Sequence, residues 1–249
     1  MNILFVTDSR GYQLQKYLDA LDTRPPFSYK VHNWGGANLS MVRAYVEREQ
    51  SKAHYHITFV SAGICDITQV NKYPRPGTNK EDRQVSYGFR NITETYRMID
   101  SFKDLTNVKF SAVAPVNLME SKDHNILTNK LNRTRYTDSQ LQDMQKLVEK
   151  DILLINMKLF QFNNSNNFST CPLEIRFLNR RRNHGKKSVS FRYTMASPRD
   201  RTVRVKLLSD GVHAGEYLKC EWLTAMYMSV KNEVTTRVQV QLHAPDEDL

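Results

Sequence analysis

Two short segments near opposite ends of the chain carry a serine, a histidine and a carboxylate. Ser9 follows the apolar run at residues 3–6, and His213 follows Asp210 by three residues. A serine hydroxyl becomes a useful nucleophile only when a nearby imidazole takes its proton, and the imidazole needs an acceptor that fixes its tautomer. At a strand-to-helix turn, Ser9 would also lie beside free backbone N–H groups that can stabilise an oxyanion. These residues are the strongest indication of chemistry in the chain.

Four short motifs, taken in order, resemble the blocks of the SGNH (GDSL-type) hydrolase superfamily. The family's blocks are Gly-Asp-Ser, a glycine, Gly-x-Asn-Asp and Asp-x-x-His, and this chain has Thr7-Asp8-Ser9, Gly35-Gly36, Gly63-Ile64-Cys65-Asp66 and Asp210 with His213. The matches cover both ends and the first third of the chain, whereas residues 75–205 match no motif. The resemblance implies a single α/β domain of three layers, α/β/α, with a flavodoxin-like parallel sheet and polar insertions.

The resemblance also implies a role for each matched residue. Ser9 would be the nucleophile, His213 the general base, and Asp210 the group that orients the imidazole. The backbone N–H groups of Ser9 and Gly36 would line the oxyanion hole. The implied activity is hydrolysis of carboxylic esters, with small acyl esters, lipid esters and carbohydrate esters all open as substrates.

One position departs from the family pattern. Where the family has an asparagine that donates to the oxyanion, this chain has Cys65, and a thiol is a weak donor. Losing one oxyanion donor typically costs about 10²–10³ in rate. We therefore expect a slow esterase, unless Asn33, Asn38 or a main-chain N–H group takes over this contact.

The composition fits one intracellular domain. With 249 residues, 40% of them hydrophobic, the chain can bury a core of ordinary size. No apolar run approaches the roughly 18 residues of a membrane helix, and residues 1–6 lack the basic start and the length of a signal peptide. The three cysteines form an odd set without framework spacing, which suits a reducing compartment. We expect a domain over residues 1–235, a tail over residues 236–249, a cytoplasmic location, and no metal or other cofactor.

The elements that must position the motifs follow an alternating pattern. Short apolar runs alternate with amphipathic ones, which is typical of a parallel sheet flanked by helices. Strands are predicted at residues 2–6, 29–33, 56–61 and 108–114, and helices at 12–21, 39–50 and 87–104. Glycines follow three of these strands, at the carboxyl ends where open α/β sheets bind ligands. The motif residues are therefore expected at one edge of the sheet.

The middle of the chain is harder to interpret. Residues 73–80 form a turn-rich insertion, and residues 119–133 a polar excursion that could cover a site. A helix is predicted at residues 137–159, with Thr137 or Asp138 as its N-cap, and a loop at 163–167. A strand at 173–178 and a last helix at 214–232 complete the prediction.

A basic segment occupies residues 176–206. It holds eleven basic residues and one acidic residue, and this excess of ten equals the formal net charge of +10 of the whole chain. Phe177, Phe191 and Tyr193 lie among the charges, and clustered cations with aromatic rings favour a phosphate backbone with stacked bases. Candidate contacts to nucleic acid are Arg180, Arg181, Arg182, Lys186, Lys187 and Arg192. Solvated surface, anionic lipid and acidic protein are alternatives for the same charges.

Two functions therefore remain open from the sequence. The first is a serine ester hydrolase. The second is a catalytically inactive scaffold of the same fold that binds RNA, DNA or another polyanion through its basic segment.

Overall fold

The computed structural model describes residues 1–21, 25–88, 91–131, 134–171, 173, 176–178, 188–190 and 208–243. In chain order its elements are β1 (Asn2–Thr7), η1 (Ser9–Gly11), α1 (Leu14–Asp19), β2 (Ser28–Asn33), α2 (Leu39–Gln50), β3 (Ile57–Ser61), η2 (Ile64–Asp66), β4 (Thr68–Pro74), β5 (Glu81–Tyr87), α3 (Ile92–Asp100), η3 (Ser101–Asp104), β6 (Val108–Phe110), α4 (Leu118–Leu127), α5 (Asp138–Ser165), β7 (Arg176–Leu178), β8 (Ser188–Ser190) and α6 (Glu216–His243), where η marks a 3₁₀ helix.

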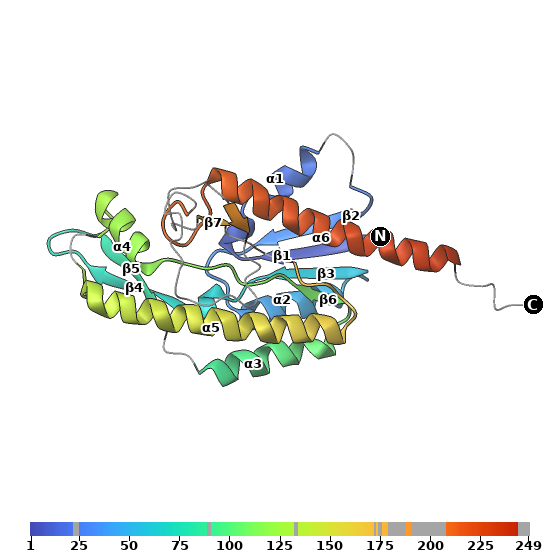
Figure 1. The fold of residues 1–249 in the computed structure, drawn as a ribbon, viewed down its shortest axis with the longest axis horizontal. Helices are drawn as coiled ribbons and strands as arrows, with labels where there is room; N and C mark the ends of the chain where they lie inside the picture. Colours follow the sequence, from blue (N-terminus) through green and yellow to red (C-terminus); the bar gives the residue numbers. More distant parts are fainter. Residues whose placement is uncertain are drawn as a thin grey trace, which may run out of the picture.

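The centre of the fold is a parallel sheet (Figure 1). Among the described residues its strand order is β2-β1-β3-β6, and every pairing is parallel. Thr7 at the end of β1 pairs with Asn33 at the end of β2 and with Ser61 at the end of β3. The carboxyl ends of three strands therefore meet at one edge, as the sequence predicts.

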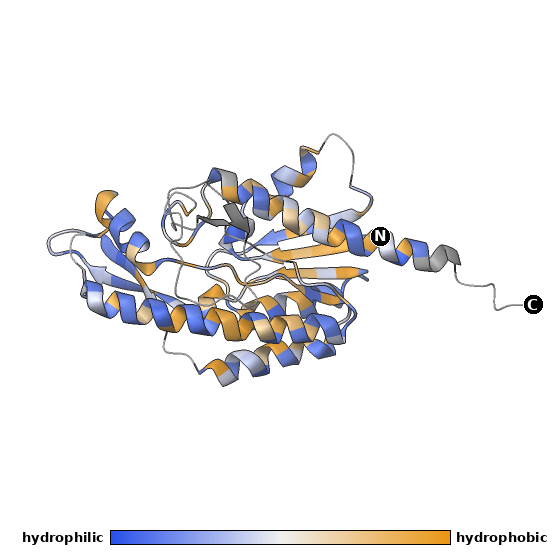
Figure 2. Cartoon of the chain, in the orientation of Figure 1, coloured by the Kyte–Doolittle hydropathy of each residue, from blue (hydrophilic) through white to orange (hydrophobic). Residues whose placement is uncertain are grey.

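Helices cover both faces of the sheet. Because successive side chains of a strand point to opposite faces, β1 contributes Leu4 and Val6 to one core and Ile3 and Phe5 to the other. The first core also contains residues of α2, α3 and α5, and the second contains residues of α1 and α6. Figure 1 shows these helices in two layers, and Figure 2 shows that apolar residues are concentrated on β1 and β3 in the centre of the sheet. The predicted three-layer α/β/α architecture is confirmed.

Two asparagines of α5 bind the backbone that continues from β6. Asn163 accepts from the Phe110 N–H and donates to its carbonyl, both at 2.9 Å. Asn156 likewise accepts from the Val113 N–H at 2.7 Å and donates to its carbonyl at 3.0 Å. These bonds explain two differences from the sequence prediction. The strand ends at Phe110 rather than at residue 114, and the helix continues to Ser165, so the loop predicted from residue 163 was wrong at its first three residues.

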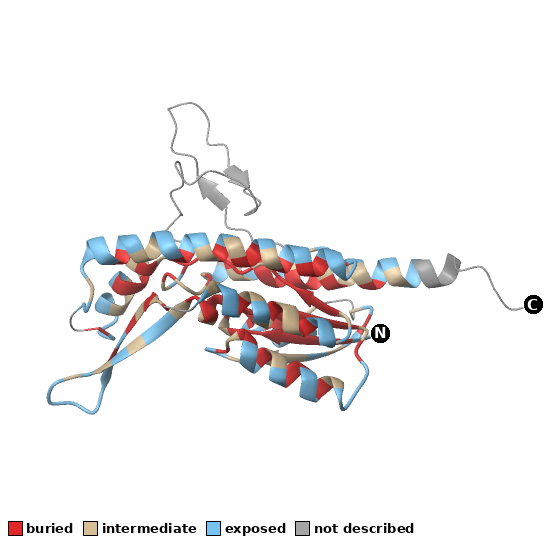
Figure 3. Cartoon of the chain, turned by 90° about the horizontal axis from the view of Figure 1, so that it is seen from below, coloured by how far each residue is buried: buried red, intermediate tan, exposed pale blue. Residues whose placement is uncertain are grey.

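A β-hairpin follows the third motif and was not predicted. β4 and β5 pair antiparallel around the insertion at residues 73–80 and form the arm that projects from the body in Figure 3. The buried face of β5 is polar, with Asp82, Gln84 and Ser86, and Asp82 pairs with Arg75. The alternation of buried and exposed residues is therefore present, but hydrophobicity does not reveal it.

Two further elements differ from expectation. The polar excursion at residues 119–133 contains α4, whose N-cap Asn117 accepts from the Glu120 N–H at 3.1 Å. The last helix, α6, runs to His243 rather than residue 232, so the tail expected from residue 236 begins inside a helix. In the described part of the chain, no helix is long and apolar enough to cross a membrane.

Candidate active site

Ser9 lies on a tight turn at the carboxyl end of β1. Asp8 is the N-cap of η1, and its Oδ1 accepts from the Arg10 N–H at 2.9 Å. Gly11 closes the turn against β1, because a Cβ at this position would lie 2.1 Å from Thr7 Oγ1. The turn therefore places Ser9, partly exposed, at the edge of the sheet where the sequence motifs converge.

Asp210 organises the loop that carries His213. Its Oδ1 accepts from the backbone N–H groups of Val212 at 3.0 Å and His213 at 2.7 Å. The Ser209 N–H donates to the His213 carbonyl at 2.8 Å and closes the loop. One carboxylate thus holds both the backbone and, through its second oxygen, the ring of the same histidine.

The loop is packed directly on α4. The Asn117 N–H donates to the Gly211 carbonyl at 2.7 Å. A Cβ on Gly211, whose φ is +76°, would lie 2.3 Å from the Asn117 carbonyl oxygen and 2.4 Å from the Ser121 nitrogen. Only glycine fits this contact, since it combines a left-handed backbone with close approach of two main chains.

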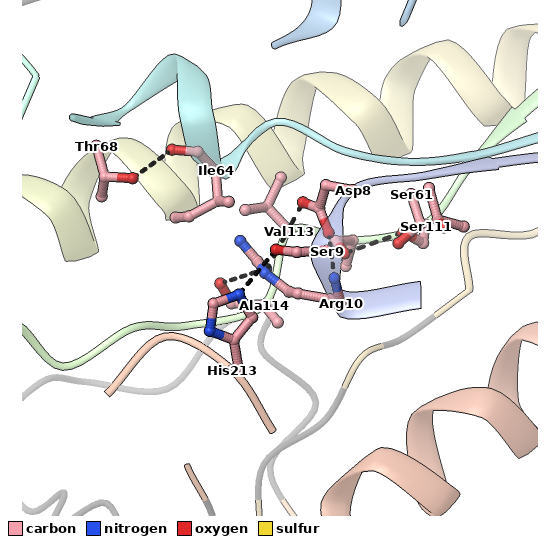
Figure 4. A network of polar contacts seen from close by, with 12 residues as sticks. Asp8, Ser9, Arg10, Ser61, Ile64, Thr68, Ser111, Val113, Ala114 and His213 are labelled. Atoms are coloured by element: carbon pink, nitrogen blue, oxygen red, sulfur yellow. Dashed lines mark hydrogen bonds and ion pairs between the residues drawn. The ribbon is translucent and has the colours of Figure 1, made fainter. Parts of the chain in front are cut away.

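The structure brings Ser9, His213 and Asp210 together from positions about 200 residues apart. Ser9 Oγ lies 2.9 Å from His213 Nε2, and His213 Nδ1 lies 2.7 Å from Asp210 Oδ2. Figure 4 shows the first of these contacts at the end of β1. With a proton on Nδ1 held by the carboxylate, Nε2 is free to accept the serine proton. This is the geometry that an activated serine nucleophile needs.

The carboxylate remains ionised over a wide pH range. Burial alone would raise the pKa of Asp210, but hydrogen bonds from the ring and backbone of His213 and from the Val212 N–H lower it to about 2. The His213 side chain is 42% exposed and that of Asp210 30%. Part of the imidazole is therefore open to solvent.

The glycine pair of the second motif lies in the loop after β2, and its first member, Gly35, borders the serine. A Cβ on Gly35 would lie 4.0 Å from Ser9 Cβ, so the loop after β2 runs beside the nucleophile position. Gly36 has a φ of +79° and is exposed, and a Cβ added to it would have no atom within 4 Å. A substrate could approach this backbone closely.

The third motif lies at the same edge, in η2. The partly buried Cys65 packs against the core, and Asp66 beside it is buried. Asp66 Oδ2 accepts from the Leu39 N–H at 2.9 Å, so this carboxylate stabilises the start of α2. Asp66 therefore has a structural role, because it connects the third motif to the start of α2.

Both asparagines that could replace the missing donor have other hydrogen bonds at their oxygens. Asn38 is the N-cap of α2, and its Oδ1 accepts from the Met41 N–H at 2.9 Å. The Oδ1 of Asn33 accepts from the hydroxyl of Thr7. Each carboxamide is therefore oriented by a neighbouring element.

The sequence analysis did not single out Arg10, which follows Ser9 directly in the turn. Arg10 as a whole is 4% exposed. Its Nη1 donates to the Ala114 carbonyl at 3.1 Å, and its Nε lies 3.8 Å from Asp8 Oδ2. A charged residue directly after the serine of the first motif was the available signal.

The residues predicted to bind nucleic acid lie outside the described part of the chain: Arg180, Arg181, Arg182, Lys186, Lys187 and Arg192. Of the basic segment, the structure describes the backbone of β7 and β8, which pair antiparallel. Within the described residues no group of three or more His, Cys, Asp or Glu side chains is placed to hold a metal ion.

Comparison with known proteins relates the fold to one group of enzymes. No protein-family model matches the sequence. No curated protein matches it either. The structure is similar to a GDSL-like lipase from Bacteroides thetaiotaomicron, with a TM-score of 0.55 and 11% identity over 95% of this chain and 88% of that one. It is also similar to the lipase/acylhydrolase from Enterococcus faecalis, with a TM-score of 0.50 and 7% identity over 93% and 96% of the two chains. The chain therefore has an SGNH hydrolase-like fold.

Proposed function

We propose that this protein is a serine ester hydrolase in which Ser9 is the nucleophile, His213 the general base and Asp210 the residue that orients the imidazole. The observation that carries the proposal is the pair of contacts of 2.9 Å and 2.7 Å that join the three side chains. The SGNH hydrolase-like fold supports it, because lipases and acylhydrolases are among the proteins with this fold.

The reaction would run in two halves. Ser9 Oγ attacks the acyl carbon while His213 Nε2 takes the hydroxyl proton, and the carbonyl oxygen becomes an oxyanion. When this intermediate collapses, the C–O bond to the alcohol breaks and His213 returns the proton to the leaving alcohol. Water then loses a proton to His213 and attacks the acyl carbon, and as the bond to Ser9 Oγ breaks, His213 returns this proton to Ser9 and the carboxylic acid is released.

Stabilisation of the oxyanion would be incomplete. The backbone N–H groups of Ser9 and Gly36 are the proposed donors, and Cys65 supplies only a weak donor at the third position. Since one missing donor costs about 10²–10³ in rate, we expect slow turnover of small, activated acyl esters.

The proposal is tested by hydrolysis of a short-chain nitrophenyl ester. Ser9→Ala and His213→Ala should each lower kcat by about 10³-fold or more, because the two groups act as a unit. Ser139→Ala, which removes an exposed serine in the first turn of α5, is the matched control and should leave kcat unchanged. Turnover by the Ser9 variant at the rate of the unmodified protein would exclude Ser9 as nucleophile.

A second function is supported by the charge distribution alone. The basic segment concentrates an excess of ten positive charges in residues 176–206, which suits contact with a polyanion such as RNA or DNA. Binding would require neither Ser9 nor His213, so variants of these residues separate the two functions.

A further inference from the structure

The guanidinium of Arg10 is buried beside the candidate nucleophile with few partners. Its side chain is 2% exposed, and Nη1 donates to the Ala114 carbonyl. Its Nε and Nη2 atoms are buried, and neither has a hydrogen-bond partner among the described residues. Figure 4 shows this side chain reaching from the Ser9 turn to Ala114.

Such a side chain is costly for folding. Buried charges need paired and hydrogen-bonded surroundings, and apolar residues of similar size often stabilise a fold as well or better. The carboxylate of Asp8 supplies only an ion pair at 3.8 Å. A functional constraint is therefore a better explanation for Arg10 than fold stability.

The partner of Arg10 belongs to a rigidly held stretch of backbone, residues 113–121, which we call the frame segment. Val113 is bound at both its N–H and its carbonyl by Asn156 of α5. Gln145, also in α5, accepts from the Leu118 N–H at 2.9 Å and donates to the Val116 carbonyl at 2.8 Å. The long helix α5 thus fixes the frame segment on both sides of Ala114.

Both halves of the candidate site are attached to this frame segment. The Ser9 turn is attached through Arg10 Nη1 and the Ala114 carbonyl. The His213 loop is attached through Gly211, which accepts from the Asn117 N–H and packs on Ser121. The segment therefore sets the distance between two groups that come from opposite ends of the chain.

We propose that Arg10 is a positioning residue for Ser9: it ties the turn that carries the serine to the frame segment, so that Ser9 Oγ stays within hydrogen-bonding distance of His213 Nε2. This inference rests on the proposed role of Ser9 as nucleophile. A displacement of about 1 Å at a nucleophile can lower the rate about 10²-fold, so loss of the hydrogen bond between Arg10 and the Ala114 carbonyl should lower kcat. Arg10 does not contact the reacting atoms, and KM is expected to change little.

The test uses the double variant Asp8→Asn/Arg10→Met in the full chain. It removes the buried pair together, so no unpaired charge is left, and the asparagine oxygen can still accept from the N–H of position 10. We expect a Tm equal to or above that of the unmodified protein, a kcat lowered by about 10²-fold, and an unchanged KM. A crystal structure of the variant should show the Ser9 Oγ to His213 Nε2 distance beyond about 3.5 Å. Arg10→Lys, which keeps a donor and the charge, should recover part of kcat.

A matched control removes another buried ion pair. Lys109 is fully buried and pairs with Glu233 at 2.7 Å, between β6 and α6. Lys109→Met/Glu233→Gln should change Tm without changing kcat.

Three results would overturn the proposal: an unchanged kcat in the Asp8/Arg10 variant, a retained hydrogen-bonding distance in its crystal structure, or a fall in kcat that only parallels a fall in Tm. The crystallographic distance decides the role of Arg10 even if the unmodified protein hydrolyses no ester. Failure of the proposed function is therefore distinguishable from failure of this inference.

Discussion

Replacing Asp210 by asparagine should separate its effect on the imidazole from its effect on the loop. The carboxylate accepts three hydrogen bonds, two from backbone N–H groups and one from the ring of His213. An asparagine oxygen can keep the backbone bonds, but its NH₂ group then faces Nδ1 and favours the wrong tautomer of the ring. In a serine protease the equivalent change lowers kcat by about 10⁴-fold, and we expect about 10³–10⁴ for Asp210→Asn.

The same substitution has a pH-dependent cost in stability. Interactions with His213 and Val212 outweigh burial and lower the pKa of Asp210 from 3.8 to about 2, and about two pKa units correspond to about 2–3 kcal/mol. Because the side chain is 30% exposed, solvent screening should reduce this to about 1–2 kcal/mol. A lowered folded-state pKa stabilises the fold above about pH 4, and this contribution disappears as the pH falls toward 2.

The assays are ester turnover at pH 7 and chemical denaturation at several pH values. The difference in free energy of unfolding between the unmodified protein and Asp210→Asn should be largest near pH 7 and should shrink below pH 4. Asp143→Asn, at an exposed position of α5, is the control and should change neither quantity. If Asp210→Asn kept kcat within about tenfold, the carboxylate would not orient the base, and the reasoning would be refuted.

Three other predictions follow from single features. Cys65→Asn should raise kcat by about tenfold or more in steady-state ester hydrolysis, and no gain would mean that another donor already fills this position. Burial, with a smaller effect of Asp123, raises the pKa of Glu120 to about 7, so the fold loses stability as the pH rises from about 4.5 to 7. Glu120→Gln should therefore increase the free energy of unfolding at pH 8 by about 1–2 kcal/mol after solvent screening, but not at pH 4, and an equal effect at both would contradict the burial argument. Neutralising the arginines at positions 180–182 should weaken RNA or DNA binding. The slope of log K against log salt concentration should become shallower by about two to three, and an affinity independent of salt concentration would exclude phosphate contacts.

The central sheet could be predicted because β1 and β3 are apolar runs and because glycines follow the ends of three strands. The carboxyl ends of parallel strands meet at one edge, so three motifs spaced along the sequence converge there. The resemblance to the SGNH (GDSL-type) hydrolase motifs also implied that Ser9 and His213 meet. The distance between Ser9 Oγ and His213 Nε2 could not be predicted, because it depends on how Gly211 packs against α4.

The unpredicted elements share a physical cause, which is polar side chains with internal partners. Asn163 reads as a loop residue in a run of asparagines, but its two bonds to Phe110 keep it in α5. In β5 the buried positions are Asp82, Gln84 and Ser86, so the strand has no apolar alternation. Patterns of hydrophobicity cannot identify such residues, since their burial depends on partners distant in sequence.

The assignment of Ser9 as an activated nucleophile is tested most directly by finding which residue a fluorophosphonate labels covalently. The reagent reacts with a serine only when a base removes its proton, so it reports activation without assuming a substrate. Peptide mass spectrometry should find one adduct per chain, on Ser9, and His213→Ala should prevent its formation. An unlabelled protein, or an adduct on another serine, would contradict the assignment of Ser9 as an activated nucleophile.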